Sequence, residues 1–227
     1  QESCIFSFPY FNGFENRLGW RNATSDDIDW RRYTGSTPSS GTGPYYAAEG
    51  SYYAYIEASG NMFMTAELLS PCFDFTDVPE LEFSFQTHMF GSNMGALALE
   101  ATTDGTSWIE IWSAIGNQGI DWFSSRVNLV NYTGESEVHF RFVGVTGSSY
   151  ESDICIDALE IGVACFSIVS DFPHINGFEA DHLGWVSDNA TTWSVVSGSG
   201  LVASGPAKGS AFAFVNGSSV LENGGET

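Results

Sequence analysis

Carboxylate side chains offer the clearest chemistry in this sequence. The segment SDDID contains Asp27 and Asp29, and further acidic residues stand at Glu15, Glu49 and Asp157. Calcium takes about six to eight oxygen ligands, several of them from carboxylates and the rest from backbone carbonyls and water. These five residues are therefore the predicted ligands of a structural calcium ion. The alternative is that Asp27 caps a turn and Asp29 pairs with a nearby arginine.

No pattern in the sequence predicts catalysis. A glycosidase needs two carboxylates at a defined separation beside a sugar groove, and nothing here singles out such a pair. The sequence has no G-x-S-x-G or H-E-x-x-H motif and no lone cysteine with a matched histidine. The histidines are scattered, and the cysteines lack the spacing of zinc ligands. We therefore expect a protein that is not an enzyme.

Aromatic residues make up 15% of the chain, and some of them stand where a partner could reach them. The predicted binding residues lie in turn-rich segments, where exposure to solvent is expected: Tyr45, Tyr46, Phe90, Trp122 and Tyr150. Exposed aromatic rings stack on sugar rings and pack against proteins equally well. Either a glycan or a protein would therefore suit these residues.

The balance of charge excludes several classes of partner. The chain has 7 basic and 28 acidic residues, which give a net charge of −21. Such a surface repels phosphate backbones, so we expect no binding to nucleic acid. No run of residues is long and apolar enough to span a bilayer, so we expect no insertion into a membrane. An acidic surface attracts cations, and it also keeps a protein soluble in a salty medium.

Short β-strands must position these side chains, because helix signals are almost absent. In ELEFSFQTH (80–88), Leu81, Phe83 and Phe85 point to one face and polar residues point to the other. Further segments with β-strand character cover residues 52–57, 96–102, 108–112, 127–129, 137–143 and 154–161. Turn sequences such as Asp104-Gly105 separate them. Many short strands with one apolar face predict an all-β fold, in which two antiparallel sheets pack as a β-sandwich.

The opening of the sequence occurs twice. FPYFNGFENRLGW (8–20) returns as FPHINGFEADHLGW (172–185), and residues 41–59 have a counterpart in residues 204–218. GWRNATSDDIDW (19–30) likewise corresponds to GWVSDNATTW (184–193), so Trp20 and Trp30 recur and are predicted core residues. The conserved order and spacing of the repeats predict one complete unit at residues 1–163. They also predict the N-terminal part of a second, truncated unit at residues 164–227.

Several segments together resemble the MAM domain family. They include NGFENRLGW, SYYAYIEAS, AELLSPCFD and VHFRFVGVTGSSYESDICIDALEI, and with their neighbours they cover nearly all of residues 12–161. The sequence of these segments resembles that of MAM units in secreted bacterial proteins. MAM domains are extracellular adhesion modules with a jelly-roll β-sandwich. The resemblance therefore implies a secreted or cell-surface module that is non-catalytic and contacts other proteins or cell surfaces. The alternatives are a carbohydrate-binding module of a secreted enzyme and a structural segment of a surface filament.

The resemblance also bears on the calcium ligands. In jelly rolls of this kind a carboxylate of the first strand and one of the last strand often meet at one edge, and Glu15 and Asp157 would form this pair. The sequence departs from animal members of the family in three places. Gly19-Trp20 has no cysteine close by, and YYAAEG follows Pro44 where those members have Asp-His-Thr. Ala158 follows Asp157 where they have a second acidic residue. Their metal ligands and cysteine pairing therefore cannot be transferred wholesale to this chain.

The cysteines and sequons suit an oxidising, extracellular compartment. Cys4 and Cys72 both stand at the ends of predicted elements, which predicts a disulfide between them. Cys155 is expected to be a free thiol in a covered position, and a bridge to Cys165 is the alternative. Four sequons would accept glycans in a eukaryotic secreted protein, at Asn22, Asn131, Asn189 and Asn216.

Overall fold

The structure, a computed structural model, describes residues 3–17, 19–78 and 80–163, and it also describes the backbone of two strands, Trp193–Ser197 and Ala211–Val215. The chain divides into two compact units, Gln1–Ala164 and Cys165–Thr227. Among the described residues no helix has the length and apolar character needed to cross a membrane.

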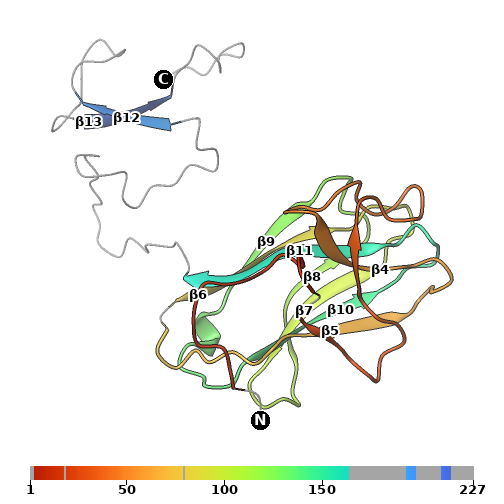
Figure 1. Cartoon of the computed structure of the whole chain (residues 1–227), viewed down its shortest axis with the longest axis horizontal. Coiled ribbons are helices and arrows are strands. Elements are labelled where there is room, and N and C mark those ends of the chain that lie inside the picture. The colour runs from red at the N-terminus through yellow and green to blue at the C-terminus, as the bar shows by residue number, and fades with distance from the viewer. Residues whose placement is uncertain (1–2, 18, 79, 164–192, 198–210, 216–227) are drawn as a thin grey trace. The chain divides into compact units, whose positions relative to one another are not determined.

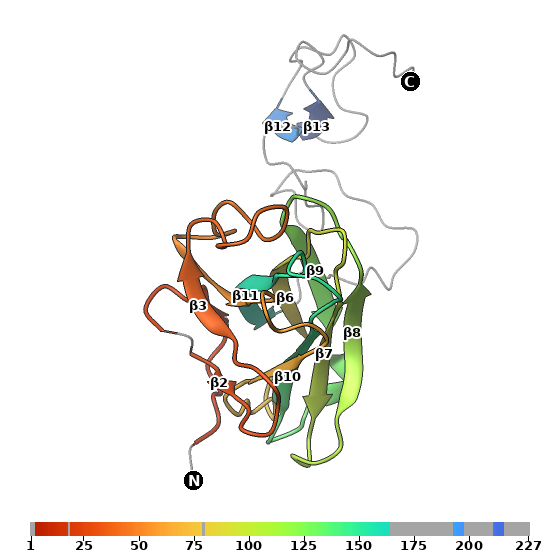
Figure 2. The ribbon, with the colours of Figure 1, turned by 90° about the vertical axis from the view of Figure 1, so that its right-hand side faces the viewer.

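The first unit is built from two antiparallel sheets (Figures 1 and 2). One sheet has the order β3-β4-β11-β6-β9, with β1 also paired to β11. It contains β1 (Tyr10–Asn12), β3 (Arg31–Thr34), β4 (Tyr52–Ile56), β6 (Leu81–His88), β9 (Phe123–Asn128) and β11 (Ile154–Val163). The other has the order β2-β5-β10-β7-β8. It contains β2 (Arg21–Asn22), β5 (Thr65–Leu69), β7 (Ala96–Thr102), β8 (Ile109–Ile115) and β10 (His139–Val145). A single 3-10 turn, Val130–Tyr132, follows β9. The predicted all-β sandwich is confirmed.

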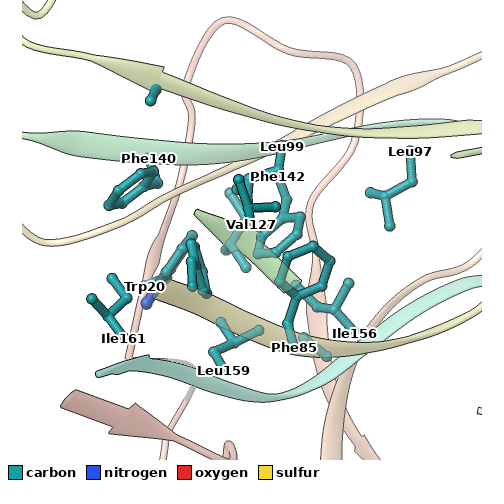
Figure 3. Packing of buried hydrophobic residues seen from close by; sticks show 14 of the residues in the cluster. Trp20, Phe85, Leu97, Leu99, Val127, Phe140, Phe142, Ile156, Leu159 and Ile161 are labelled. Carbon is teal, nitrogen blue, oxygen red and sulfur yellow. The ribbon is translucent and has the colours of Figure 1, made fainter. Parts of the chain in front are cut away.

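The core lies between the two sheets and consists largely of aromatic rings (Figure 3). Phe83 of β6 packs against Phe140 of β10 with 5.3 Å between ring centroids. Phe85 packs in the same way against Phe142, at 5.1 Å. Trp20 lies among these rings and is 5% exposed. The alternation of apolar and polar residues along each strand sends these side chains to one face, so the sequence predicted this core correctly.

The sequence located most strands but missed those with little apolar alternation. β2 and β3 were not predicted, a strand leading into SPCFD was expected where β5 lies, and β9 begins at Phe123 instead of residue 127. The residues of β3, RRYT, have no apolar face, and their strand conformation depends on pairing with β4. Glu15 was expected in the first strand, but β1 ends at Asn12. Phe14 has a φ of 60°, which ends the extended backbone before Glu15 is reached.

A disulfide joins Cys4 to Cys72, the pair predicted from the sequence. The N-H of Ile5 donates to the carbonyl of Cys72, and the N-H of Asp74 donates to the carbonyl of Ile5, both at 2.8 Å. These bonds place the N-terminal segment in parallel beside Phe73. The disulfide therefore ties the start of the chain to the segment that follows β5.

In the second unit, β12 (Trp193–Ser197) pairs with β13 (Ala211–Val215) in antiparallel fashion. When Trp193 is aligned with Trp30, as the sequence repeat requires, this pair has the same register as β3 and β4. The partners Arg31–Tyr55, Arg32–Ala54, Tyr33–Tyr53 and Thr34–Tyr52 correspond to Ser194–Phe214, Val195–Ala213, Val196–Phe212 and Ser197–Ala211. The two segments thus share both sequence order and strand pairing.

Candidate functional site

The long connection between β3 and β4, residues 35–51, covers a second, smaller cluster of buried side chains. In β4, Ala54 and Ile56 point into the main core, whereas Tyr53 and Tyr55 point to the opposite face of the sheet. There they pack with Cys155 of β11, and Ala47 of the connection completes the cluster. We call residues 35–51 the covering loop.

Hydrogen bonds to β11 and to the segment before β9 hold the covering loop in place. Asp157 Oδ2 accepts the N-H groups of Ala48 and Glu49, at 2.8 and 2.9 Å. The N-H of Asp153 donates to the Thr42 hydroxyl at 2.9 Å. From the other side, Trp122 Nε1-H donates to the carbonyl of Tyr46 at 2.9 Å. The loop backbone is therefore attached at several points along its length.

One glycine of the covering loop is required by close packing. Gly43 has a φ of 66°, and a Cβ at this position would lie 2.1 Å from the hydroxyl oxygen of Thr37. The Thr37 hydroxyl donates to the carbonyl of Thr42 at 3.2 Å, which closes this part of the loop on itself. A larger residue at position 43 would open the loop.

The structure brings some of the predicted binding residues together and separates others. Tyr45 and Tyr46 are 72% and 70% exposed on the covering loop, and Trp122 lies beside them, half-buried, through its bond to Tyr46. Phe90 is half-buried after β6, and Tyr150 is exposed on the connection between β10 and β11.

Two exposed apolar side chains beside Trp122 escaped the sequence reasoning. They are Ile120 and Phe123, which are 52% and 57% exposed. The signal that could have found them is the segment IDWF, in which three of the four residues are apolar, directly after the turn residue Gly119.

Two of the predicted calcium ligands, Asp157 and Glu49, lie near each other, with Glu49 exposed on the covering loop and Asp157 buried in β11. Asp157 is fully buried, and its carboxylate accepts the N-H groups of Ala48, Glu49 and Ala158. Burial raises the pKa of Asp157 to about 6, these N-H groups oppose the rise, and the nearby Glu49 carboxylate adds to it. Asp157 is thus placed to anchor the loop backbone.

Glu15 reaches the end of the same loop from the N-terminal side. Its Oε1 accepts the N-H groups of Ser51 and Tyr52 at 2.8 and 2.9 Å, and these donors hold the pKa of Glu15 below its usual value. The Arg32 guanidinium donates to the backbone carbonyl of Glu15 and lies over the Tyr52 ring. Residues 48–52 therefore lie between the carboxylates of Glu15 and Asp157.

The other two predicted ligands lie in the segment before β3. Asp27 Oδ2 accepts the N-H of Thr65 at 2.9 Å, and the Asp27 N-H donates back to the Thr65 carbonyl at 3.0 Å. Asp29 is exposed. In the described part of the chain, no three of the five predicted carboxylates have oxygen atoms within 4.8 Å of one another.

The described residues contain one group of three ligand types within this distance, namely Cys72, Glu137 and His139. The Cys72 sulfur is already bonded to Cys4, so it is not a thiolate ligand in this structure.

Polar groups without full hydrogen bonding lie on the same side of the sheet. Asp153 Oδ1 accepts the N-H of Ala58 at 3.0 Å, and its Oδ2 is buried without a hydrogen-bond partner. Burial raises the pKa of Asp153 to about 6, with the Glu57 charge adding to the rise. His88 Nε2-H donates to the carbonyl of Ile120 at 2.8 Å, whereas its Nδ1 is buried and unpaired.

Cys155, the strand partner of His88, is a buried free thiol whose pKa is raised well above its usual value by burial. It is therefore poorly suited to act as a nucleophile. The bridge to Cys165 that was the alternative for this residue falls partly outside the described residues.

Comparisons with known proteins place this geometry in a family. The family model for the MAM domain, meprin/A5/mu, matches residues 12–166. MAM domain-containing glycosylphosphatidylinositol anchor protein 2 of Mus musculus is 32% identical over 155 residues, which cover 60% of this chain and 16% of that protein. The corresponding protein 1 of Gallus gallus is 33% identical over 154 residues, which cover 63% of this chain and again 16% of the relative.

A solved structure shows the same fold. The K1 cleaved adhesin domain of Lys-gingipain from Porphyromonas gingivalis superposes with a TM-score of 0.50 at 16% sequence identity. The match covers 69% of this chain and 99% of that domain. At this level of identity the likeness concerns the fold alone.

Proposed function

The chain belongs to the MAM domain family, and from this premise we propose that it is a non-catalytic, extracellular module that binds other proteins or cell surfaces. Relatives that share the domain carry a glycosylphosphatidylinositol anchor in their names, which supports a place outside the cell. The Cys4–Cys72 disulfide supports an oxidising compartment.

One observation carries the binding role. Tyr45 and Tyr46 are largely exposed although the backbone that bears them is attached to β11 and Trp122. Exposed aromatic rings on a fixed backbone lose little conformational entropy when a partner covers them. Asp153, Cys155 and Asp157, by contrast, are buried on the side of the sheet that the loop covers.

An adhesion assay tests the proposal. Beads coated with the whole chain are passed over surfaces that carry collagen, fibronectin, laminin or mucin, and beads coated with serum albumin serve as controls. We expect retention on at least one surface above the albumin level. Retention no higher than that of the albumin beads on every surface would contradict the proposed function. Hydrolysis of a standard peptide or glycoside substrate by the chain would contradict it too.

Carbohydrate binding is the second candidate, because the same exposed tyrosine rings could stack on sugar rings. A glycan array probed with the whole chain separates the two functions. Binding to defined sugars with no retention on glycan-free protein surfaces would favour a carbohydrate-binding module.

A calcium ion near Glu15, Glu49 and Asp157 stays a prediction. Glu15 and Asp157 lie on either side of the segment 48–52, which contains Glu49, and N-H groups donate to Asp157 and to one oxygen of Glu15. We derive no part of the binding function from calcium. Titration of the EDTA-treated chain with calcium chloride in a calorimeter tests the ion, with Glu49→Gln as the variant that should weaken binding.

We also propose that residues 164–227 form the start of a second MAM-type unit. The repeated sequence order supports this, and so does the register that β12 and β13 share with β3 and β4. Two linked units would increase the overall affinity for a surface that carries several binding sites. Cross-strand nuclear Overhauser effects between Val195 and Ala213 are expected, and a different strand pairing would contradict the proposal.

A further inference from the structure

Four apolar side chains lie on two separate segments of the first unit that a hydrogen bond joins. They are Tyr45 and Tyr46 of the covering loop with Ile120 and Trp122 of the segment before β9. Phe123 is exposed too, but it pairs with Thr87 and has the parity of the core residue Val127, so it points to the opposite face of the sheet from Trp122. The bond from Trp122 Nε1-H to the Tyr46 carbonyl connects the two segments directly. We call these four side chains the tyrosine surface.

We propose that the tyrosine surface docks a protein partner whose contact residues are apolar and are bordered by lysine and arginine. The inference rests on the proposed binding function and names the partner class for it. Three of the four side chains are more than half exposed, which is unusual for large apolar residues on two connected segments.

The base of the tyrosine surface is rigid. Trp122 packs edge-on against the buried ring of Tyr53 at 5.8 Å and against His88 at 5.4 Å. His88 also holds the carbonyl of Ile120, and Ala47 is buried directly after Tyr46. A partner would therefore meet side chains whose backbone is already ordered, which is the condition for strong contacts from few residues.

The negative charges at the border of the tyrosine surface favour a basic partner. Asp121 is exposed between Ile120 and Trp122, and Glu49 is exposed three residues after Tyr46. The sequence has no lysine or arginine from residue 33 to residue 125, so neither segment of the surface brings a positive charge. Lysine and arginine side chains around an apolar contact would complement this border.

The other occupants suit the tyrosine surface less well. A second copy of the chain would bring the same acidic border, and its net charge of −21 would repel the first copy. A sugar needs hydrogen-bond donors and acceptors beside the aromatic rings. Trp122 and His88 have their N-H groups turned inward to the carbonyls of Tyr46 and Ile120.

The test uses a displayed library of random peptides selected on the whole immobilised chain. Enriched peptides are synthesised, and their affinity is measured by fluorescence polarisation for the wild type and for the double variant Tyr45→Ala, Tyr46→Ala. Phe63→Ala, which removes an exposed aromatic ring from the connection between β4 and β5, is the matched control. Asp121→Lys reverses the charge at the border without removing an apolar side chain.

We expect enriched peptides that combine aromatic or aliphatic residues with lysine or arginine. The double variant should weaken their binding at least about ten-fold, whereas Phe63→Ala should change it less than about two-fold. Asp121→Lys should weaken binding too, and added salt should do the same. The double variant should keep the wild-type thermal midpoint, because both side chains are exposed.

Other results would overturn the inference. Peptides that bind the double variant as well as the wild type would place the contact elsewhere while leaving the binding function intact. Enriched peptides without basic residues, sugar binding that depends on the two tyrosines, or dimerisation that depends on them would each refute the basic protein partner. A failure of any peptide to enrich, together with a negative adhesion assay, would refute the proposed function as well.

Discussion

Replacement of Asp153 by asparagine should make the protein more stable at neutral pH. The carboxyl group is fully buried, its Oδ1 accepts the N-H of Ala58, and its Oδ2 has no hydrogen-bond partner. Asparagine has the same shape and keeps an acceptor for Ala58, but it carries no charge. The substitution therefore removes a buried negative charge at little cost in packing.

The size of the effect follows from the pKa of Asp153, which burial raises from 3.8 to about 6. The native state holds the proton more tightly than the unfolded chain does. The stability linked to this group is therefore present below about pH 4 and is lost as the pH rises through about 6. This rise in the pKa of Asp153 corresponds to a change of about 3 kcal/mol in the free energy of unfolding. The advantage of Asp153→Asn should grow from near zero at about pH 4 to as much as about 3 kcal/mol at about pH 7.5.

Urea unfolding of the wild type and the variant across this pH range measures the difference, with tryptophan fluorescence as the probe because Trp20 and Trp30 are buried. Asp104→Asn is the control of opposite sign. Its exposed carboxylate accepts the N-H groups of Thr106 and Ser107, which hold its pKa well below the usual value, so this variant should be less stable at neutral pH. A difference between Asp153→Asn and wild type that does not change with pH would refute the reasoning. So would a loss of stability at neutral pH, because it would mean that the native protein compensates the charge of Asp153.

Three further experiments test other contacts. Replacement of Cys4 and Cys72 by serine removes the disulfide, whose cysteines have a sequence separation of 68. In urea titrations under non-reducing conditions, the variant should have a free energy of unfolding that is lower by about 4 kcal/mol. When the chain is secreted from a eukaryotic host, peptide mass mapping should find a glycan on the exposed Asn131. It should find none on Asn22, whose side-chain amide is bonded to the backbone of residue 30 at both ends, and an occupied Asn22 would contradict this geometry. Arg141→Leu leaves two half-buried glutamates without their shared partner, so urea unfolding should show a loss of about 2 kcal/mol. If Arg141→Lys has the same free energy of unfolding as the wild type, this would argue against a guanidinium that bridges both carboxylates.

The strands were predictable wherever side chains alternate between apolar and polar. Phe83, Phe85, Phe140 and Phe142 all lie in the core as the pattern requires, because neighbouring residues of a strand point to opposite faces of the sheet. β3 could not be predicted in this way. Its strand conformation comes from backbone pairing with β4, and that pairing leaves no mark on the residue types of the segment.

The candidate surface was predictable only in part. Turn-rich surroundings correctly indicated that Tyr45, Tyr46 and Tyr150 are exposed. The contact between Tyr46 and Trp122 joins residues 76 positions apart, so no local pattern could reveal it. For the same reason Ile120 joined the surface only when the tertiary structure was known.

What the sequence by itself determined is the architecture: alternating strands, turn residues between them, a repeated opening, family motifs and two cysteines at the ends of elements. Only the tertiary structure decided what the polar and aromatic side chains do. Asp157 was recognisable as an acidic residue, but its three N-H donors include two that lie 109 and 108 positions away in the chain. The role of a side chain depends on the partners that folding brings to it, and strand pairing across the sheet supplies those partners from distant parts of the chain.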